Sequence, residues 1–92
     1  MLDGERNAGV VDARRRYDEL RLAHEAATAE LASRREALRV AEAQRASRPD
    51  AYHQTLATTR EQRDRVLNLV GQVKRAGAVL TLVEAQAQGS RS

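Results

Sequence analysis

Two histidines and a large set of arginines are the residues of this chain whose chemistry invites a functional interpretation. Histidine is a common metal ligand, so His24 and His53 are the first candidates for a metal site. In the helical hairpin that the sequence predicts, they would lie roughly 30 Å apart. Two ligands that far apart cannot share an ion. The chain has no cysteine, so the sequence predicts no metal site and no cofactor.

Arginine supplies fifteen of the sixteen basic residues, and its planar guanidinium suits carboxylates and phosphates. Arg34 and Arg45 are eleven residues apart, and Arg60 is followed directly by Glu61. This spacing resembles that of the small all-helical chorismate mutases. The resemblance implies basic side chains that hold the two carboxylates of a dianionic substrate.

The chain departs from the chorismate mutase pattern at two positions. Tyr17 stands where the family has an arginine on its first helix, and Ala57 stands where it has an aspartate. No glycine-rich phosphate loop, HExxH helix or nucleophile elbow occurs. We therefore assign no catalytic residues and expect a non-enzymatic protein without a small-molecule substrate, and a small chorismate-mutase-like enzyme is the alternative.

The charges are spread along the chain rather than gathered into one patch. The net charge is +3, and acidic and basic residues alternate at four-residue spacing, which places them on one helix face. The pairs are Arg15/Glu19, Arg21/Glu25, Glu30/Arg34, Arg60/Asp64 and Glu61/Arg65. This pattern is typical of a solvated helix surface. With only two aromatic residues available for stacking, we do not expect a nucleic-acid partner.

The elements that carry these residues are two long helices. Good helix formers dominate residues 10–46 without Pro or Gly, and Pro49 interrupts the pattern. The sequence predicts a helix over 10–46, a turn over 47–49 and a helix over 50–88. Ser47 would cap the second helix, with Asp50 in a capping box. Residues 1–9 and 89–92 are expected to be flexible ends.

The fold class predicted is all-α, an antiparallel two-helix hairpin resembling a coiled coil. Apolar residues at three- and four-residue steps form the facing stripes of the two helices. The hairpin core would consist of Tyr17, Leu20, Leu31, Val66, Leu69, Val73, Leu80 and Val83. Folding the chain about Arg48 places Arg45 against Tyr52 and Arg34 against Gln62. The core should therefore lie at the open end, with polar layers near the turn.

The second helix has another small and apolar face, which one partner helix could not cover together with the first. Its predicted partner-binding residues are Leu67, Val70, Gly71, Ala78, Leu82 and Ala85. We expect this face to bind a second copy, giving a four-helix bundle dimer, or another helical protein. In the alternative, Gly71 and Gly77 split the helix, and a third helix folds back onto this face.

The turn offers a second resemblance. The segment Pro49-Asp50-Ala51-Tyr52, followed by a polar and then an apolar helix, is similar to the co-chaperones of bacterial type III secretion systems. The resemblance implies a small chaperone-like component of such a system.

Composition bears on location and stability. No run of apolar residues approaches the roughly 20 needed to cross a bilayer, and the first residues lack the apolar core of a secretory signal. We therefore expect a cytoplasmic protein without a membrane span. A core of Ala, Val and Leu in 92 residues would be thin, which favours oligomerisation.

Overall fold

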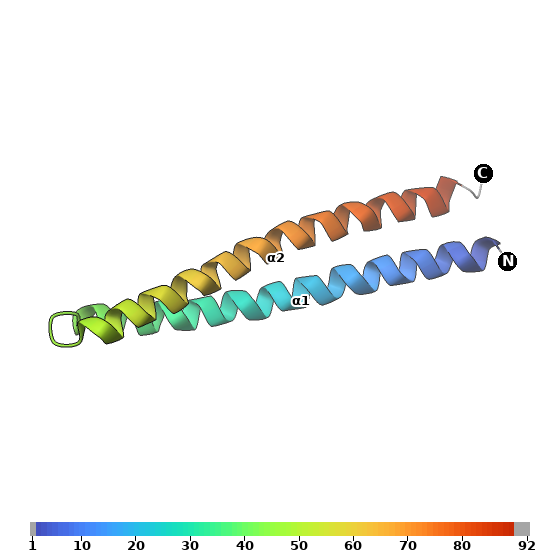
Figure 1. The fold of residues 1–92 in the computed structure, drawn as a ribbon. Helices are drawn as coiled ribbons and strands as arrows, with labels where there is room; N and C mark the ends of the chain where they lie inside the picture. The colour runs from blue at the N-terminus through green and yellow to red at the C-terminus, as the bar shows by residue number, and fades with distance from the viewer. Residues whose placement is uncertain (1, 90–92) are drawn as a thin grey trace. The chain divides into compact units, whose positions relative to one another are not determined.

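The fold is a two-helix hairpin, seen in a computed structural model that describes the backbone of residues 2–89 and the side chains of residues 8–89. The first helix, α1, runs over Leu2–Ala43, and the second, α2, runs over Pro49–Gly89 (Figure 1). Within residues 2–89 there is no strand. The predicted all-α hairpin is confirmed.

The helix bounds differ from the predicted ones mainly at the start of α1. We expected that helix to begin at residue 10, but it begins at Leu2 and continues through Gly4 and Gly9. A glycine costs only about 1 kcal/mol in a helix interior, whereas each added residue gains a backbone hydrogen bond. The helix α2 includes Gly89. Of the predicted flexible ends, Met1 and residues 90–92 lie outside the described residues.

The turn between the helices is closed by backbone hydrogen bonds that tighten the end of α1. The amides of Gln44 and Arg45 donate to the carbonyls three residues earlier, at 3.1 and 3.2 Å, and the Arg48 amide donates to the Gln44 carbonyl at 2.8 Å. The predicted capping role of Ser47 is wrong, because its hydroxyl donates to the Gln44 carbonyl at 3.1 Å. It therefore serves the end of α1 rather than the start of α2.

The first turn of α2 matches the sequence in two other respects. Pro49 occupies the first helical position, where its missing N–H leaves no hydrogen bond unmade, and Asp50 lies beside it near the positive end of the helix dipole. The guanidinium carbon of Arg45 lies 4.8 Å from the centre of the Tyr52 ring, a cation–π contact. The predicted pairing of Arg45 with Tyr52 is confirmed.

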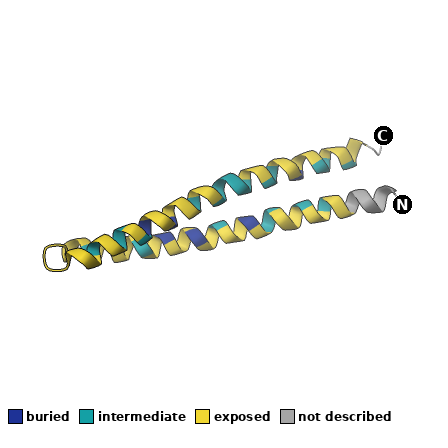
Figure 2. Ribbon diagram, viewed as in Figure 1, coloured by how far each residue is buried: buried dark blue, intermediate teal, exposed yellow. Residues whose placement is uncertain are grey.

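Residues of the hairpin group into two compact units. The terminal unit comprises Met1–Ala23 and Leu69–Ser92, and the turn unit comprises His24–Asn68. Ala27, Leu31, Thr59 and Gln62 are buried in the turn unit, and Leu20 and Leu80 are buried in the terminal unit (Figure 2). The buried leucines, Leu20, Leu31 and Leu80, belong to the predicted core, and the buried polar residues Thr59 and Gln62 lie nearer the turn, where the sequence predicts polar layers. Small and polar residues of the turn unit also reach the helix interface.

In the terminal unit, one glycine of α2 lies beside an aromatic ring of α1. A Cβ atom built at Gly77 would lie 3.4 Å from Cε2 of the Tyr17 ring. At Gly71 the nearest atom is Nη1 of Arg75, on the same helix, at 3.4 Å. The helix is continuous through both glycines, so they do not start a third helix.

Ion pairs form on the surface, and some of them are the pairs that the four-residue spacing of charges predicts. Arg34 Nη2 contacts Glu30 Oε1 at 2.8 Å, a predicted pair, whereas Asp64 pairs with Arg63 at 3.2 Å instead of Arg60. Arg39 donates two hydrogen bonds to Glu36, at 2.6 and 3.1 Å. These bonds, together with the positive charge of Arg39, lower the pKa of the Glu36 carboxyl.

We expect Gly71→Ala to stabilise the protein more than Gly77→Ala does. Alanine gains about 1 kcal/mol of helix propensity at either site. At Gly71 the new methyl group meets only the flexible end of Arg75, whereas at Gly77 it meets the packed Tyr17 ring. Thermal unfolding followed by circular dichroism measures both variants. Equal gains would contradict the close packing of Gly77 on Tyr17.

The Glu36–Arg39 pair predicts a small pH-dependent stabilisation. Because the pKa of Glu36 is lowered in the folded protein, the contribution is present above the unfolded pKa of about 4.3 and is lost as the pH falls through the folded pKa. Glu36→Gln should therefore lower the melting temperature slightly at pH 7 in low salt, with no difference from wild type in strong acid. A difference that persists in strong acid would show another cause.

Candidate interaction surface

The residues predicted to form the hairpin core are covered to different degrees. Leu20, Leu31 and Leu80 are buried, with 7%, 6% and 6% of their surface exposed. Tyr17, Val66, Leu69, Val73 and Val83 are half-buried. Within residues 8–89, no side chain falls below 2% exposure. The interface between two helices thus encloses little that is completely removed from water.

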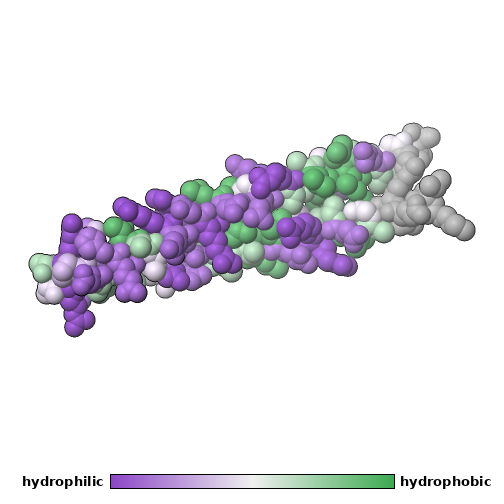
Figure 3. Space-filling model, in the orientation of Figure 1, coloured by the Kyte–Doolittle hydropathy of each residue, from purple (hydrophilic) through white to green (hydrophobic). Residues whose placement is uncertain are grey.

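The residues predicted to bind a partner lie partly at the surface. In the terminal unit, Ala78, Leu82 and Ala85 are exposed, and Val70 and Gly71 are half-buried. We call these five residues of α2 the apolar row. Leu82 keeps 59% of its surface exposed, and Leu67, in the turn unit, keeps 62%. Figure 3 shows hydrophobic side chains at the surface of the C-terminal part of α2.

Sequence reasoning missed apolar exposure on α1 and on the flank of α2. Val11 and Leu22 of α1 are 53% and 60% exposed, Val79 of α2 is 52% exposed, and Val40 is 49% exposed. Val11 and Leu22 lie about three turns apart and so share one helix face. That spacing was the available signal, but the predicted interaction surface included only residues of α2.

A groove of about 420 Å³ runs between the helices of the terminal unit. Ala13, Arg16 and Leu20 of α1 line it, together with Gln72, Arg75, Ala76 and Val79 of α2. Arg14 on α1 pairs with Glu84 on α2 at 3.6 Å in the same unit. The groove combines apolar side chains with one arginine from each helix. The sequence of either helix alone therefore does not reveal it.

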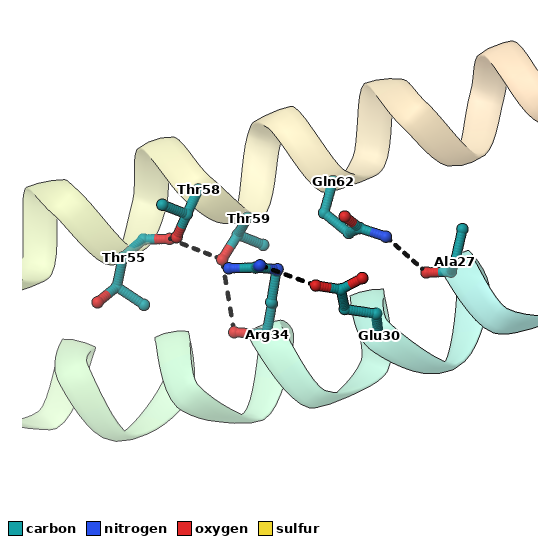
Figure 4. A network of polar contacts seen from close by, with 7 residues as sticks. All are labelled: Ala27, Glu30, Arg34, Thr55, Thr58, Thr59 and Gln62. Atoms are coloured by element: carbon teal, nitrogen blue, oxygen red, sulfur yellow. Dashed lines mark hydrogen bonds and ion pairs between the residues drawn. The ribbon is translucent and has the colours of Figure 1, made fainter.

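The turn unit contains a polar layer at the helix interface (Figure 4). Gln62 is buried, and its Nε2 donates to the Ala27 carbonyl across the interface at 2.9 Å. The Thr59 hydroxyl lies 2.7 Å from the Thr55 carbonyl and 3.4 Å from the Arg34 carbonyl. The predicted neighbours Gln62 and Arg34 line one pocket, while the hydrogen bond of Gln62 is made to the Ala27 carbonyl.

The structure brings together only some of the residues that resemble the chorismate mutase pattern. Arg34 and Glu61 line one polar pocket of about 220 Å³ with Thr58, Gln62 and Arg65. Arg34 Nε is buried there without a hydrogen-bond partner, while its Nη2 contacts Glu30. Arg45 instead lies over the Tyr52 ring, and Arg60 is exposed outside this pocket. The pocket could hold an anionic group, but it does not assemble the set that the resemblance implies.

The two histidines do not form a metal site with other residues. His53 contacts the edge of the Tyr52 ring, with 5.4 Å between ring centres, and His24 is half-buried. In the part of the chain that the structure describes, no three His, Cys, Asp or Glu residues are grouped to hold an ion.

The prediction that the chain has no membrane span is wrong, because α2 has the length and the apolar composition of a membrane-crossing helix. In α2, a window of 18 residues has a mean hydropathy of 1.3 and no more than two charged residues, which meets the criteria for a membrane-crossing helix. Only 6% of this window is buried. Requiring an unbroken apolar run for a membrane span is too strict. The mean hydropathy of the window stays high although Lys74 and Arg75 interrupt it. The homodimeric or helical partner stays a prediction.

Comparison with known proteins finds no match: no family model, no curated protein and no solved structure is similar to this chain.

We expect Gln62→Ala to destabilise the hairpin by about 1–2 kcal/mol, because it removes a buried hydrogen bond and leaves a gap beside Ala27. Gln54→Ala is the matched control, an exposed glutamine of α2 in the same unit, and should change stability by less than about 0.5 kcal/mol. Urea unfolding measures both. Equal effects would show that the bond to Ala27 contributes nothing.

Proposed function

We propose that the chain is a non-enzymatic interaction protein that packs the apolar row of α2 against another helix. The observation that carries the proposal is the exposure of Leu82, at 59%, between exposed Ala78 and Ala85 on the same helix. Burying a leucine side chain stabilises a contact by about 1.5–3 kcal/mol. An apolar row that stays in water is a typical surface for helix-in-groove recognition.

The small residues of the row support a helix as the partner. Helix axes pack about 8–10 Å apart, and the side chains at the contact set the distance. Gly71 and Ala78 have little or no side chain, so a second helix could approach the backbone of α2 closely. Gly71 meets no atom of α1 within 4 Å of a built Cβ, so this close approach is not already used inside the hairpin.

The thin core gives a second reason for association. Buried apolar residues of the described chain are Leu20, Ala27, Leu31 and Leu80, a small number for an independent domain. The four-helix dimer predicted from the sequence is one form of assembly that would cover further apolar surface. The co-chaperone function implied by the turn would be another instance of the same binding mode.

The leucines at the surface allow a matched test. Leu22, Leu67 and Leu82 are 60%, 62% and 59% exposed, so substitution by glutamate should perturb folding equally. We expect Leu82→Glu, in the apolar row, to abolish association. Leu67→Glu, at a predicted partner-binding residue of the same helix, should do the same, whereas Leu22→Glu on α1 should retain association. Light scattering coupled to size exclusion over a range of concentrations measures the mass, and circular dichroism checks that each variant is helical.

Three outcomes would contradict the proposal. The wild type could be a monomer at every concentration, or all three variants could associate like the wild type, or all three could lose association equally. Because α2 is long and apolar enough to cross a membrane, flotation with lipid vesicles is a further measurement. A wild type that floats with vesicles, and still does so as Leu82→Glu, would identify lipid rather than a helix as the binding partner.

A further inference from the structure

We propose that the groove of the terminal unit binds an amphipathic helix of a partner protein whose apolar stripe is flanked on both sides by acidic residues. This inference rests on the proposed function, since it names the chemistry of a helix that the hairpin would bind. It concerns a different surface from the apolar row. Its basis is the combination of an apolar floor with an unpaired cation on each wall.

The floor and walls of the groove come from both helices. Leu20, which is 7% exposed, forms part of the floor, and Val79, which is 52% exposed, offers apolar surface at its side. Arg16 contributes a guanidinium from α1, and Arg75 contributes one from α2. A helix lying between α1 and α2 would place apolar side chains over Leu20 and Val79 with a guanidinium on either flank.

The two flanking cations lack acidic partners. Among the side chains that the structure describes, neither Arg16 nor Arg75 forms an ion pair, although Asp12 lies one turn before Arg16. No acidic residue occurs on α2 between Asp64 and Glu84, so Arg75 has none within reach on its own helix. By contrast, Arg14 in the same unit is paired with Glu84.

Charge complementarity therefore selects the flanks of the partner helix. In helix bundles, residues beside the apolar stripe form ion pairs that set the choice and orientation of the partner. Glutamate or aspartate on both sides of the stripe would meet Arg16 and Arg75 together. Lysine or arginine there would place like charges side by side, which disfavours binding.

The shape of the groove favours a helix over a lipid surface. A bilayer presents a broad surface that would contact the protruding Leu82 and Val79 but not the nearly covered Leu20 between the helices. A single helix can enter such a groove, because helices pack ridge into groove at close range. The volume of about 420 Å³ provides room for a few side chains of such a helix.

The experiment uses the full chain and two synthetic helical peptides with the same leucine stripe, one flanked by glutamate and the other by lysine. Fluorescence anisotropy of labelled peptide measures binding at low salt. We expect the glutamate peptide to bind and the lysine peptide to bind at least tenfold more weakly. Arg16→Glu and Arg75→Glu should each weaken the glutamate peptide by about tenfold.

Arg15→Glu is the matched control, an exposed arginine next to Arg16 that does not line the groove, and should change the affinity less than about twofold. The double variant Arg16→Glu, Arg75→Glu should reverse the preference in favour of the lysine peptide. This reversal would distinguish specific contacts from a general effect of net charge. Circular dichroism of each variant checks that the hairpin remains folded.

Equal binding of the two peptides, or no binding of either, would overturn the inference. So would an Arg15→Glu effect as large as that of Arg16→Glu. If both peptides bind equally and Leu82→Glu abolishes their binding, the proposed function stands while the groove assignment fails. Anionic vesicles that bind through Arg16 and Arg75, with no binding of the glutamate peptide, would assign the groove to lipid instead.

Discussion

Two helices that pack against each other can each bury only one stripe of their surface. A third or fourth helix is needed to cover the remaining faces. In this chain, the stripe that faces the other helix includes Leu20, Leu31 and Leu80, all nearly covered. Apolar side chains outside that stripe stay in water, among them Leu22 on α1 and Leu82 on α2. The exposed apolar surface follows from this constraint together with the composition of α2.

Within each of the two units, different side chains hold α1 and α2 together. In the turn unit, the buried amide of Gln62 donates to the carbonyl of Ala27, which is also buried. In the terminal unit, Gly77 admits the ring of Tyr17. A polar hydrogen bond and an aromatic ring on glycine each define the local contact, where aliphatic packing alone would be permissive.

Exposure of α2 links the proposed interaction to the membrane criterion. Most of the apolar side chains that make α2 apolar enough to cross a membrane are half-buried or exposed in the hairpin, and only 6% of the window is buried. In a core helix those side chains would be hidden. Here they keep part of their surface exposed, so the same residues carry both the proposed helix binding and its lipid alternative. Arg16 and Arg75, flanking the groove, add the charge that would select between partners.

The amino-acid sequence by itself determined the two helices and the turn between them. Residues of high helix propensity without internal proline require long helices, and Pro49 must begin a new one, because it cannot continue a helix across its missing N–H. Because the turn is short, it fixes which residues of the two helices lie opposite each other next to it. The contact of Arg45 with the Tyr52 ring was therefore predictable. The start of α1 was not, because the glycines near it weaken a helix without ending it.

Tertiary structure decided which side chains meet away from the turn. Gln62 of α2 bonds to the Ala27 carbonyl of α1, and Gly77 of α2 lies against the Tyr17 ring of α1. Apolar periodicity marks a stripe but not its offset along the partner helix, since that offset depends on the fit of all facing side chains together. The groove between Arg16 and Arg75 arises in the same way. Its residues are distant in the chain, and only the packing of α1 on α2 within the terminal unit makes them one surface.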